Sequence, residues 1–212
     1  MLMDAQTYDD EAINVNAPVY AYYAVRILEK TGIYRGVCLD VGCGGGYLGL
    51  ALAPISELSF IFLDQSADML GCAEKNIARF ALRDRAQIVQ APVQNIPLAD
   101  SSVELIVSRG SVPFWDKLET AFAELHRVLK PGGRAYIGGG MGPPGLWDSL
   151  QQKARHFEPR RGYRKPAIPR RERGVYEQAL GTAGIRGFSV SHSDDGTWIE
   201  FGKAVGSAGH NR

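Results

Sequence analysis

The stretch LDVGCGGGYLGLALA, residues 39–53, combines the end of an apolar strand, a glycine-rich turn and the start of a helix. The run GVCLDV at 36–41 is short and apolar and stops at a glycine, which is typical of a buried strand. Glycines allow positive φ and let a ligand approach the backbone without an intervening Cβ. The following helix offers unpaired N–H groups in its first turn. The stretch therefore predicts a strand–loop–helix unit that can hold a small ligand.

Strands and helices alternate on the C-terminal side of this unit. Further strands are predicted over residues 58–64, 86–91, 103–108 and 134–139, and helices over 19–30, 47–53, 67–82, 118–129 and 170–184. Residues 185–205 predict two more strands, joined by a turn at 194–196. Alternating strands and helices favour a parallel sheet with helices on both faces, here followed by an antiparallel hairpin.

Composition limits the class of protein. The chain has 212 residues, which suits one domain, and its net charge of +1 gives no reason to expect a nucleic-acid or membrane partner. Cys38, Cys43 and Cys72 lack metal-ligand spacing, so we expect no metal and a reducing compartment. The N-terminus lacks a basic and apolar leader, and no stretch approaches the roughly 20 apolar residues of a membrane-spanning helix. These features predict a cytoplasmic protein.

Two ligand classes fit the glycine-rich turn. Gly44, Gly46 and Gly49 satisfy the G-x-G-x-x-G spacing of a dinucleotide site. Asp64 lies 20 residues after the first of them, where a ribose-binding acid is expected. The other class is S-adenosylmethionine, whose amino-acid portion would lie on the same backbone while Asp64 binds the ribose. Asp40 favours this second class, because a dinucleotide fold keeps this strand apolar and a buried carboxylate needs polar partners.

Two further motifs support the second class. IPLADSSVELIVS (96–108) places a polar turn before the fourth strand, and ELHRVLKPGGRAYIGGG (124–140) ends a helix with a Pro-Gly-Gly turn before the fifth. Over residues 39–140, about half of the chain, these motifs resemble the class I S-adenosylmethionine-dependent methyltransferases of the methyltransferase domain 11 or 25 type. The resemblance implies an α/β, Rossmann-like, doubly wound, mostly parallel seven-stranded sheet with an antiparallel C-terminal strand. It also implies an enzyme that methylates a small-molecule acceptor.

The resemblance assigns cofactor contacts to residues near the carboxyl ends of successive strands. The turn after the first strand would line the methionine part of S-adenosylmethionine, Asp64 would bind the ribose hydroxyls, and Gln65 and Met69 would lie near the adenine. The expected cofactor-binding residues are Asp40, Gly42, Cys43, Gly44, Asp64, Gln65, Met69, Pro92, Val93 and Ser108. No residue pattern marks a catalytic base, so we name no catalytic residue.

One position departs from the family pattern. Relatives read Gly-Asp-Ala after the third strand, and that Asp accepts a hydrogen bond from the adenine amino group. This chain has Pro92 in place of the Asp. The Val93 N–H could still reach the adenine ring and Gln94 could replace the acceptor, unless the loop is shifted by a residue or two. We therefore expect weaker or differently oriented adenine recognition.

Acceptor contacts are expected beyond the fourth strand, because open α/β sheets bind ligands outside the carboxyl ends of their strands. Arg109 could hold an anionic acceptor or a carboxylate of the cofactor. Tyr8 lies in an N-terminal segment where the family often builds a lid. The expected substrate-binding residues are Tyr8, Arg109, Ser111 and Trp115. A plain surface or core role for each of them stays open.

We divide the chain into an N-terminal helical lid or cap (1–35), a methyltransferase domain (36–206) and a disordered tail (207–212). Within the domain, residues 153–173 form a basic insert that is rich in proline. We favour a solvated loop for this insert, then a site for a small anionic acceptor, and last a track for RNA phosphates. The chain is expected to be a monomer or homodimer. Two other functions stay open: a non-catalytic S-adenosylmethionine-binding protein and an NAD-dependent oxidoreductase.

Overall fold

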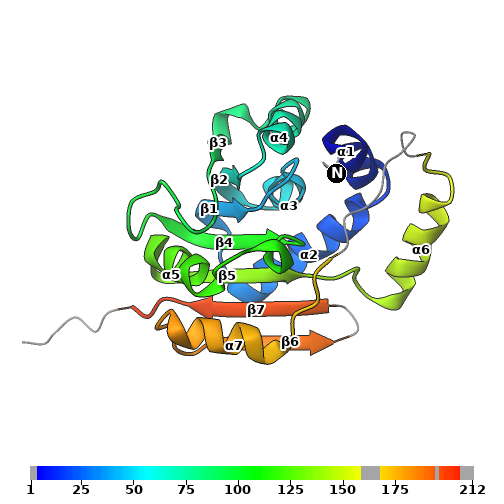
Figure 1. Cartoon of the computed structure of the whole chain (residues 1–212). Helices are drawn as coiled ribbons and strands as arrows, with labels where there is room; N and C mark the ends of the chain where they lie inside the picture. The colour runs from blue at the N-terminus through cyan, green and yellow to red at the C-terminus, as the bar shows by residue number, and fades with distance from the viewer. Residues whose placement is uncertain (1–3, 159–167, 194–195, 206–212) are drawn as a thin grey trace, which may run out of the picture.

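One seven-stranded sheet organises the molecule. The structure, a computed structural model, describes residues 4–158, 168–193 and 196–205. The strands are β1 (Arg35–Val41), β2 (Glu57–Asp64), β3 (Ala86–Gln90), β4 (Val103–Arg109), β5 (Leu129–Gly139), β6 (Ser189–Ser193) and β7 (Gly196–Gly202). Their order is β3-β2-β1-β4-β5-β7-β6 (Figure 1), and β7 alone runs antiparallel to the other strands. This confirms the predicted mostly parallel, doubly wound sheet with an antiparallel C-terminal strand.

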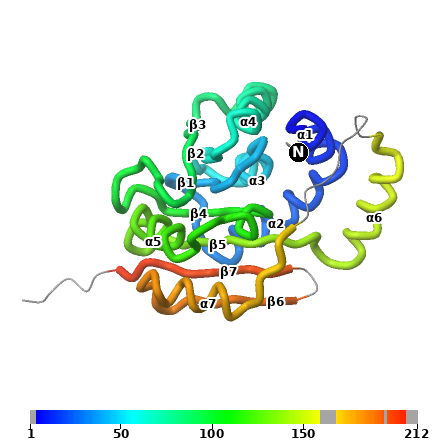
Figure 2. The backbone as a smooth tube through the Cα atoms, viewed as in Figure 1, coloured from blue at the N-terminus to red at the C-terminus, as the bar shows by residue number. Residues whose placement is uncertain are grey.

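Helices cover both faces of the sheet (Figures 1 and 2). The α-helices are α1 (Ala5–Asn14), α2 (Ala17–Thr31), α3 (Tyr47–Leu52), α4 (Ala67–Arg79), α5 (Leu118–Val128), α6 (Pro144–Ala154) and α7 (Arg173–Thr182). Apolar residues of α5 and α7 pack on one face, and those of α2, α3 and α4 pack on the other. In the part of the chain that the structure describes, no helix has both the length and the apolar character needed to cross a bilayer.

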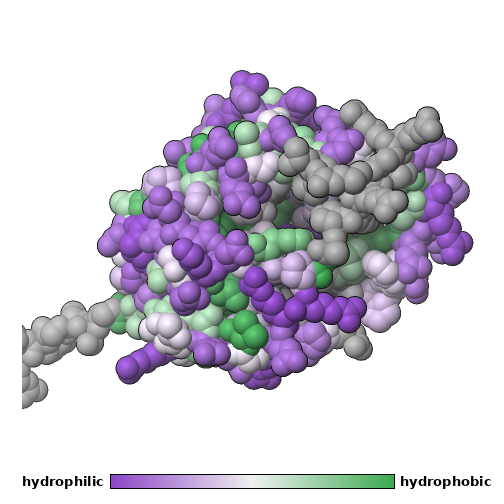
Figure 3. Space-filling view, viewed as in Figure 1, coloured by the Kyte–Doolittle hydropathy of each residue, from purple (hydrophilic) through white to green (hydrophobic). Residues whose placement is uncertain are grey.

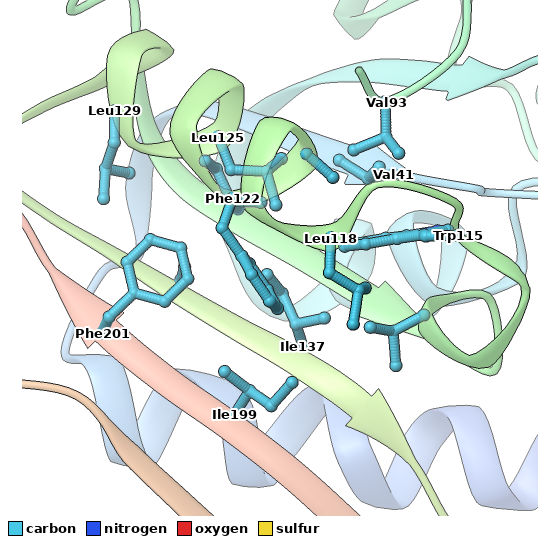
Figure 4. Packing of buried hydrophobic residues seen from close by; sticks show 14 of the residues in the cluster. Val41, Val93, Trp115, Leu118, Phe122, Leu125, Leu129, Ile137, Ile199 and Phe201 are labelled. Atoms are coloured by element: carbon cyan, nitrogen blue, oxygen red, sulfur yellow. The ribbon is translucent and has the colours of Figure 1, made fainter. Parts of the chain in front are cut away.

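Each face of the sheet has its own core. On the α5 face, Phe122 lies 6.3 Å, centroid to centroid, from both Trp115 and Phe201 (Figure 4). On the other face, Trp198 of β7 packs between Tyr23 of α2 and Tyr136 of β5. Hydrophilic side chains cover most of the surface seen in Figure 3, with hydrophobic patches between them. Burial of these aromatic side chains stabilises the packing of the helices on both faces of the sheet.

The chain reverses direction across the sheet between β1 and β4. From β1 it proceeds outward through β2 to β3, and from β4 it proceeds the other way to β5. β1 pairs with β2 at Val41↔Leu63 and with β4 at Asp40↔Val107. The carboxyl ends of β1, β2 and β4 therefore lie side by side at a switch point, where open α/β sheets bind ligands.

Three elements differ from the sequence prediction. Helices α1 and α6 were not predicted individually, although Pro144 occupies the first turn of α6, where proline is compatible with a helix. Strand β5 begins at Leu129 and includes the Pro-Gly-Gly segment, with a shift in its pairing to β4 between Val103 and Leu105. The predicted pure turn at 130–133 is therefore an irregular part of the strand.

The basic insert is only partly a loop. Lys153 belongs to α6 and Arg173 begins α7, so both ends of the insert are helical. Arg171 Nη2 donates to the backbone oxygen of Trp115 at 2.7 Å. Residues 159–167 of the predicted loop, the turn residues 194–195 and the tail at 207–212 lie outside the described residues.

Candidate functional site

The glycine-rich loop follows β1 and leads directly into α3. Gly42 has φ +61° and Gly44 φ +56°, a left-handed backbone that side chains with a Cβ rarely adopt. Cys43 N donates to Leu63 O at 3.1 Å, and Gly46 N donates to Cys43 O at 2.9 Å. The loop backbone therefore has a defined shape that is tied to β2.

Ser111 fixes the loop after β4 against the glycine-rich loop. Its hydroxyl donates to Val41 O and accepts from Trp115 Nε1, both at 3.1 Å. Ser108 Oγ lies 2.6 Å from Ser111 Oγ, and Ser108 must donate here because the single Ser111 proton goes to Val41. A Cβ on Gly42 would collide with the Ser111 side chain. The Ser111 hydroxyl is thus fully used in positioning the two loops.

Asp40 is a carboxylate inside the sheet, with 1% of its surface exposed. Its Oδ2 accepts from Gly49 N of α3 at 3.0 Å, which joins β1 to the helix after the loop. Burial raises the pKa of Asp40 to about 7, while the Gly49 hydrogen bond opposes the rise and the charge of Asp64 adds to it. Asp40 therefore supports the loop from behind.

Asp64 stands at the carboxyl end of β2 and is partly exposed. Its Oδ2 accepts from Gly44 N and its Oδ1 from Ser66 N, each at 2.9 Å. A carboxylate has about four lone-pair sites, so each oxygen keeps capacity for another donor. Ser66 is the residue that caps α4, because its Oγ accepts from Met69 N at 3.3 Å. Asp64 is therefore not needed to cap α4, and its carboxylate can accept hydrogen bonds from hydroxyl groups of a ligand in front of it.

A cavity of about 640 Å³ opens where the glycine-rich loop, the end of β2 and the loop after β4 meet. Its size lies within the roughly 300–1,000 Å³ that small-molecule sites occupy. The predicted site residues that line it are Tyr8, Gly42, Gly44, Asp64, Gln65, Met69, Pro92, Val93, Arg109, Ser111 and Trp115. The other predicted residues, Asp40, Cys43 and Ser108, are buried behind the lining. The topology thus brings most of the predicted residues to one cavity.

The loop after β3 forms one side of the cavity, and Pro92 and Val93 both line it. The Gln94 side-chain amide donates to Asp116 O, which joins this loop to the one after β4. Within the described parts of the chain, nothing accepts a hydrogen bond from Val93 N. The Val93 N–H is therefore available to a ligand, and the Gln94 amide keeps its second N–H and its acceptor oxygen.

Arg109 lines the cavity from the end of β4. Its Cζ lies 4.6 Å from the ring centroid of Tyr20 and 5.7 Å from that of Tyr23, and its Nη2 donates to Gly140 O at 2.6 Å. Burial, helped by neighbouring Tyr8, raises the pKa of Tyr20, so this ring meets Arg109 as a neutral phenol. The aromatic faces and the Gly140 carbonyl together hold the guanidinium in the cavity wall.

A buried polar cluster joins α1 to the glycine-rich loop. Asp9 Oδ1 accepts from Tyr47 Oη and from Asn76 Nδ2, both at 2.8 Å. Asn76 Nδ2 also donates to Gly45 O at 3.1 Å. Helix α1 also brings Tyr8 to the cavity, and both views show α1 beside α4 (Figures 1 and 2). The N-terminal helix is therefore part of the cavity wall.

Sequence reasoning left some lining residues out of the site. These are Leu63, Ser66, Ala91, Gly110, Phe114, Asp116 and Lys117, whereas Gln94, expected near the adenine, also lines the cavity. Asp116 and Lys117 follow the predicted Trp115 directly, so that tryptophan was the available signal for them. Asp9 and Asn76 gave no signal, because 67 residues separate them in the sequence. Among the described residues, no group of three or more His, Cys, Asp or Glu could hold a metal ion.

Comparison with known proteins adds sequence and structural relatives. A family model described as a methyltransferase domain matches residues 39–137. A malonyl-[acyl-carrier protein] O-methyltransferase of Methylovorus sp. is 34% identical over 51% of this chain and 39% of its own length. A ubiquinone/menaquinone biosynthesis C-methyltransferase of Geotalea daltonii is 32% identical over 49% of this chain and 45% of its own. The matched part thus spans less than half the length of these curated relatives.

A crystal structure extends the likeness to almost the whole chain. It is that of a candidate S-adenosylmethionine-dependent methyltransferase of Methanococcus maripaludis, 37% identical in sequence, with a TM-score of 0.82. The superposition covers 96% of this chain and 94% of that one. The chain therefore belongs to the S-adenosylmethionine-dependent methyltransferases, the family whose cofactor is S-adenosylmethionine.

Proposed function

We propose that this chain is an enzyme that transfers the methyl group of S-adenosylmethionine to a small-molecule acceptor in an in-line displacement. The observation that carries the proposal is the 2.9 Å hydrogen bond between Gly44 N and Asp64, beside a cavity at the switch point of the sheet. Family membership supports it. Two relatives are also named for methyl transfer, one to malonyl-[acyl-carrier protein] and one in ubiquinone/menaquinone biosynthesis.

The residues around the cavity fit the cofactor. Gly42 and Gly44 present backbone without Cβ atoms to the cavity, which suits the amino-acid portion of S-adenosylmethionine. Asp64 has acceptor capacity left for the ribose hydroxyls. The adenine would lie among Gln65, Met69, Pro92 and Val93, with the Val93 N–H as a backbone donor. When bound, the cofactor supplies an already activated methyl group on a sulfonium.

Because the donor is activated, the protein has mainly to align the acceptor and exclude water. Trp115 and the Ser111-bonded loop form one wall for the acceptor, and Tyr8 of α1 forms another. A general base is needed only for an acceptor that must lose a proton near neutral pH. We therefore assign positioning roles to these residues and no proton-transfer role to any of them.

Other features extend the proposal. The domain would comprise residues 36–206, with 1–35 as its helical lid and 207–212 as a tail. Arg109 and Lys117 line the cavity, which agrees with an anionic acceptor. Cys38, Cys43 and Cys72 are free and buried, which suits a reducing, cytoplasmic location. We propose a monomer or homodimer.

Calorimetric titration of the purified chain tests the ligand class. We expect binding of S-adenosylhomocysteine and no measurable binding of NADH. Tight binding of NADH without binding of S-adenosylhomocysteine would support the oxidoreductase instead and refute the proposal.

A second experiment separates an enzyme from a non-catalytic binder. The chain is incubated with methyl-labelled S-adenosylmethionine and a panel of small carboxylic acids, phenols and amines, and transfer of label is measured. We expect at least one labelled product, and much less of it with the Asp64→Ala variant at a cofactor concentration that does not saturate the variant. Binding of the cofactor with no transfer to any class in the panel would favour a sensor or scaffold.

A further inference from the structure

Arg109 is a cation in the cavity wall with no anionic partner. None of the carboxylates in the described ranges forms an ion pair with it. Its Nη2 donates to Gly140 O, but its Nε is buried without an acceptor. A buried N–H without a partner costs about 1–3 kcal/mol, and more when the group is charged. The stacking on Tyr20 and Tyr23 offsets only part of this cost.

The register of the sheet places Arg109 in line with the cofactor loop. Val41 of β1 pairs with Leu63 of β2, and Asp40 pairs with Val107 of β4. Continuing the β1–β2 register by one step aligns Gly42 with Asp64, and continuing the β1–β4 register by two steps aligns Gly42 with Arg109 on the other side. A ligand that crosses the strand ends would therefore meet a carboxylate at one end and a guanidinium at the other, and both line the cavity.

We propose that Arg109 binds a carboxylate of a ligand in this cavity, an inference that rests on the proposed function. A guanidinium presents its donors in a planar fork whose edges match a carboxylate, one edge formed by Nη2 with Nε and one by Nη2 with Nη1. Nη2 gives one of its two protons to Gly140 O and keeps the other, while neither Nε nor Nη1 has an acceptor in the described chain. The aromatic rings of Tyr20 and Tyr23 fix the plane of the fork, which lowers the entropy lost on binding. The site is therefore preorganised for a planar anion.

Two molecules can supply this carboxylate. One is the cofactor, through the carboxylate of its aminocarboxypropyl end, and the other is the acceptor. The register argument is the same for both, because each would lie over Gly42 between Asp64 and Arg109. If the cofactor supplies the carboxylate, Arg109 binds it when the cofactor alone is present. If the acceptor supplies it, Arg109 stays without a carboxylate until the acceptor binds.

The first arm of the test uses nucleosides only. Arg109→Gln, Arg109→Lys and wild type are titrated with S-adenosylhomocysteine, which has the carboxylate, and with 5′-methylthioadenosine, which lacks it. If the cofactor supplies the anion, Arg109→Gln weakens the affinity for S-adenosylhomocysteine at least tenfold. The affinity for 5′-methylthioadenosine then stays within twofold of wild type, and Arg109→Lys loses less affinity for S-adenosylhomocysteine than Arg109→Gln does. Arg79→Gln is the matched control, because Arg79 also lies over an aromatic ring, 5.7 Å from the centroid of Phe80, but on the exposed surface of α4.

The second arm tests the acceptor as the source. Benzoate and succinate are titrated into the S-adenosylhomocysteine-loaded proteins, with benzamide as the neutral probe. If the acceptor supplies the anion, both nucleosides bind all variants equally, and wild type and Arg79→Gln bind at least one carboxylate probe. Arg109→Gln then loses that binding at least tenfold. Benzamide binding stays the same in all of them.

Two results overturn the proposal. In the first, Arg109→Gln lowers the affinity for both nucleosides equally and also lowers the unfolding midpoint. Arg109 would then have a structural role in the cavity wall and no role in binding an anion. Unchanged nucleoside affinities, with carboxylate probes that do not bind or bind all variants alike, remove any anion role. In both cases wild type still binds S-adenosylhomocysteine, so the proposed function stands. If wild type does not bind it, the proposed function itself has failed.

Discussion

Asp64 combines a structural and a binding role within one carboxylate. Each oxygen accepts one backbone N–H, from Gly44 and from Ser66, and these bonds fix the carboxylate in the direction of the cavity. Hydrogen bonds to a charged group contribute about 1.5–3 kcal/mol each, roughly twice as much as neutral ones. Loss of the carboxylate should therefore affect ligand affinity more than its small exposed surface indicates.

We expect Asp64→Ala to weaken S-adenosylhomocysteine binding at least tenfold in calorimetry, because the ribose loses charge-assisted acceptors. Asp64→Asn keeps one acceptor oxygen and should lose less affinity for S-adenosylhomocysteine than Asp64→Ala. Asp68→Ala, on the exposed first turn of α4, serves as the control and should bind like wild type. An affinity within twofold of wild type for Asp64→Ala would remove this residue from the ligand site.

Asp40 makes the stability of the protein depend on pH. Burial, opposed by the Gly49 hydrogen bond and helped by Asp64, raises its pKa from 3.8 to about 7. Between these two values the folded protein holds a proton that the unfolded chain has lost, so the free energy of unfolding falls as pH rises. Above the folded pKa the loss is complete, and below the unfolded pKa the contribution is fully present.

Asp40→Asn removes this titration and keeps an oxygen that can accept from Gly49 N. We expect the stability of wild type relative to the variant to fall by on the order of 2 kcal/mol between about pH 5 and about pH 8. Urea unfolding of both proteins across this range measures the difference. Parallel pH profiles would show that Asp40 has an ordinary pKa in the folded state.

At the scale of elements, α1 is held to the glycine-rich loop by buried polar contacts. Asp9 is 6% exposed and Asn76 3%, and both Tyr47 and Asn76 donate to the same Asp9 oxygen. Since Asn76 also donates to Gly45 O, the docking of α1 and the shape of the loop are coupled. A Cβ on Gly45 would collide with Asp9, so close approach requires glycine here.

We expect Asp9→Ala to lower the free energy of unfolding by about 2 kcal/mol, because it leaves two buried donors without an acceptor. Amide hydrogen exchange in α1 should accelerate, and S-adenosylhomocysteine should bind more weakly because the loop loses a support. Asp10→Ala is the control, since in the described chain the Asp10 carboxylate accepts from Gln6 and its backbone oxygen from Asn14, both on the same helix. Equal effects of the two variants would show that α1 packs without this cluster.

Local sequence patterns predicted elements better than contacts between them. The short apolar runs predicted β1, β2, β3 and β4 because burial of a central parallel strand demands continuous apolar residues. Helix α6 was missed because Pro143, Pro144 and Gly145 are typical of loops, although proline fits the first helical turn. The Asp9 cluster could not be predicted, because its partners are 38 and 67 residues away in the sequence.

At the scale of the whole molecule, alternation of strands and helices was enough to predict a parallel sheet with ligand contacts at the carboxyl ends of its strands. It could not predict how the C-terminal hairpin supports the cavity. Trp198 of β7 lies 4.4 Å from Tyr23 and 4.8 Å from Tyr136, centroid to centroid. Tyr23 in turn faces Arg109 in the cavity wall. The last strand, the second helix and the site therefore form one packed unit.

Trp198 is 1% exposed, and its Nε1 has no hydrogen-bond partner among the described residues. We expect Trp198→Ala to lower the free energy of unfolding by about 3–5 kcal/mol, because a large cavity opens between α2, β5 and β7. Trp198→Phe keeps an aromatic ring and removes a buried unpaired N–H, so it should cost less than half as much. Guanidinium unfolding of both variants and wild type measures this order. A Trp198→Ala protein within about 1 kcal/mol of wild type would mean that the hairpin folds onto the sheet without this ring, and that the cavity wall is held from the N-terminal side alone.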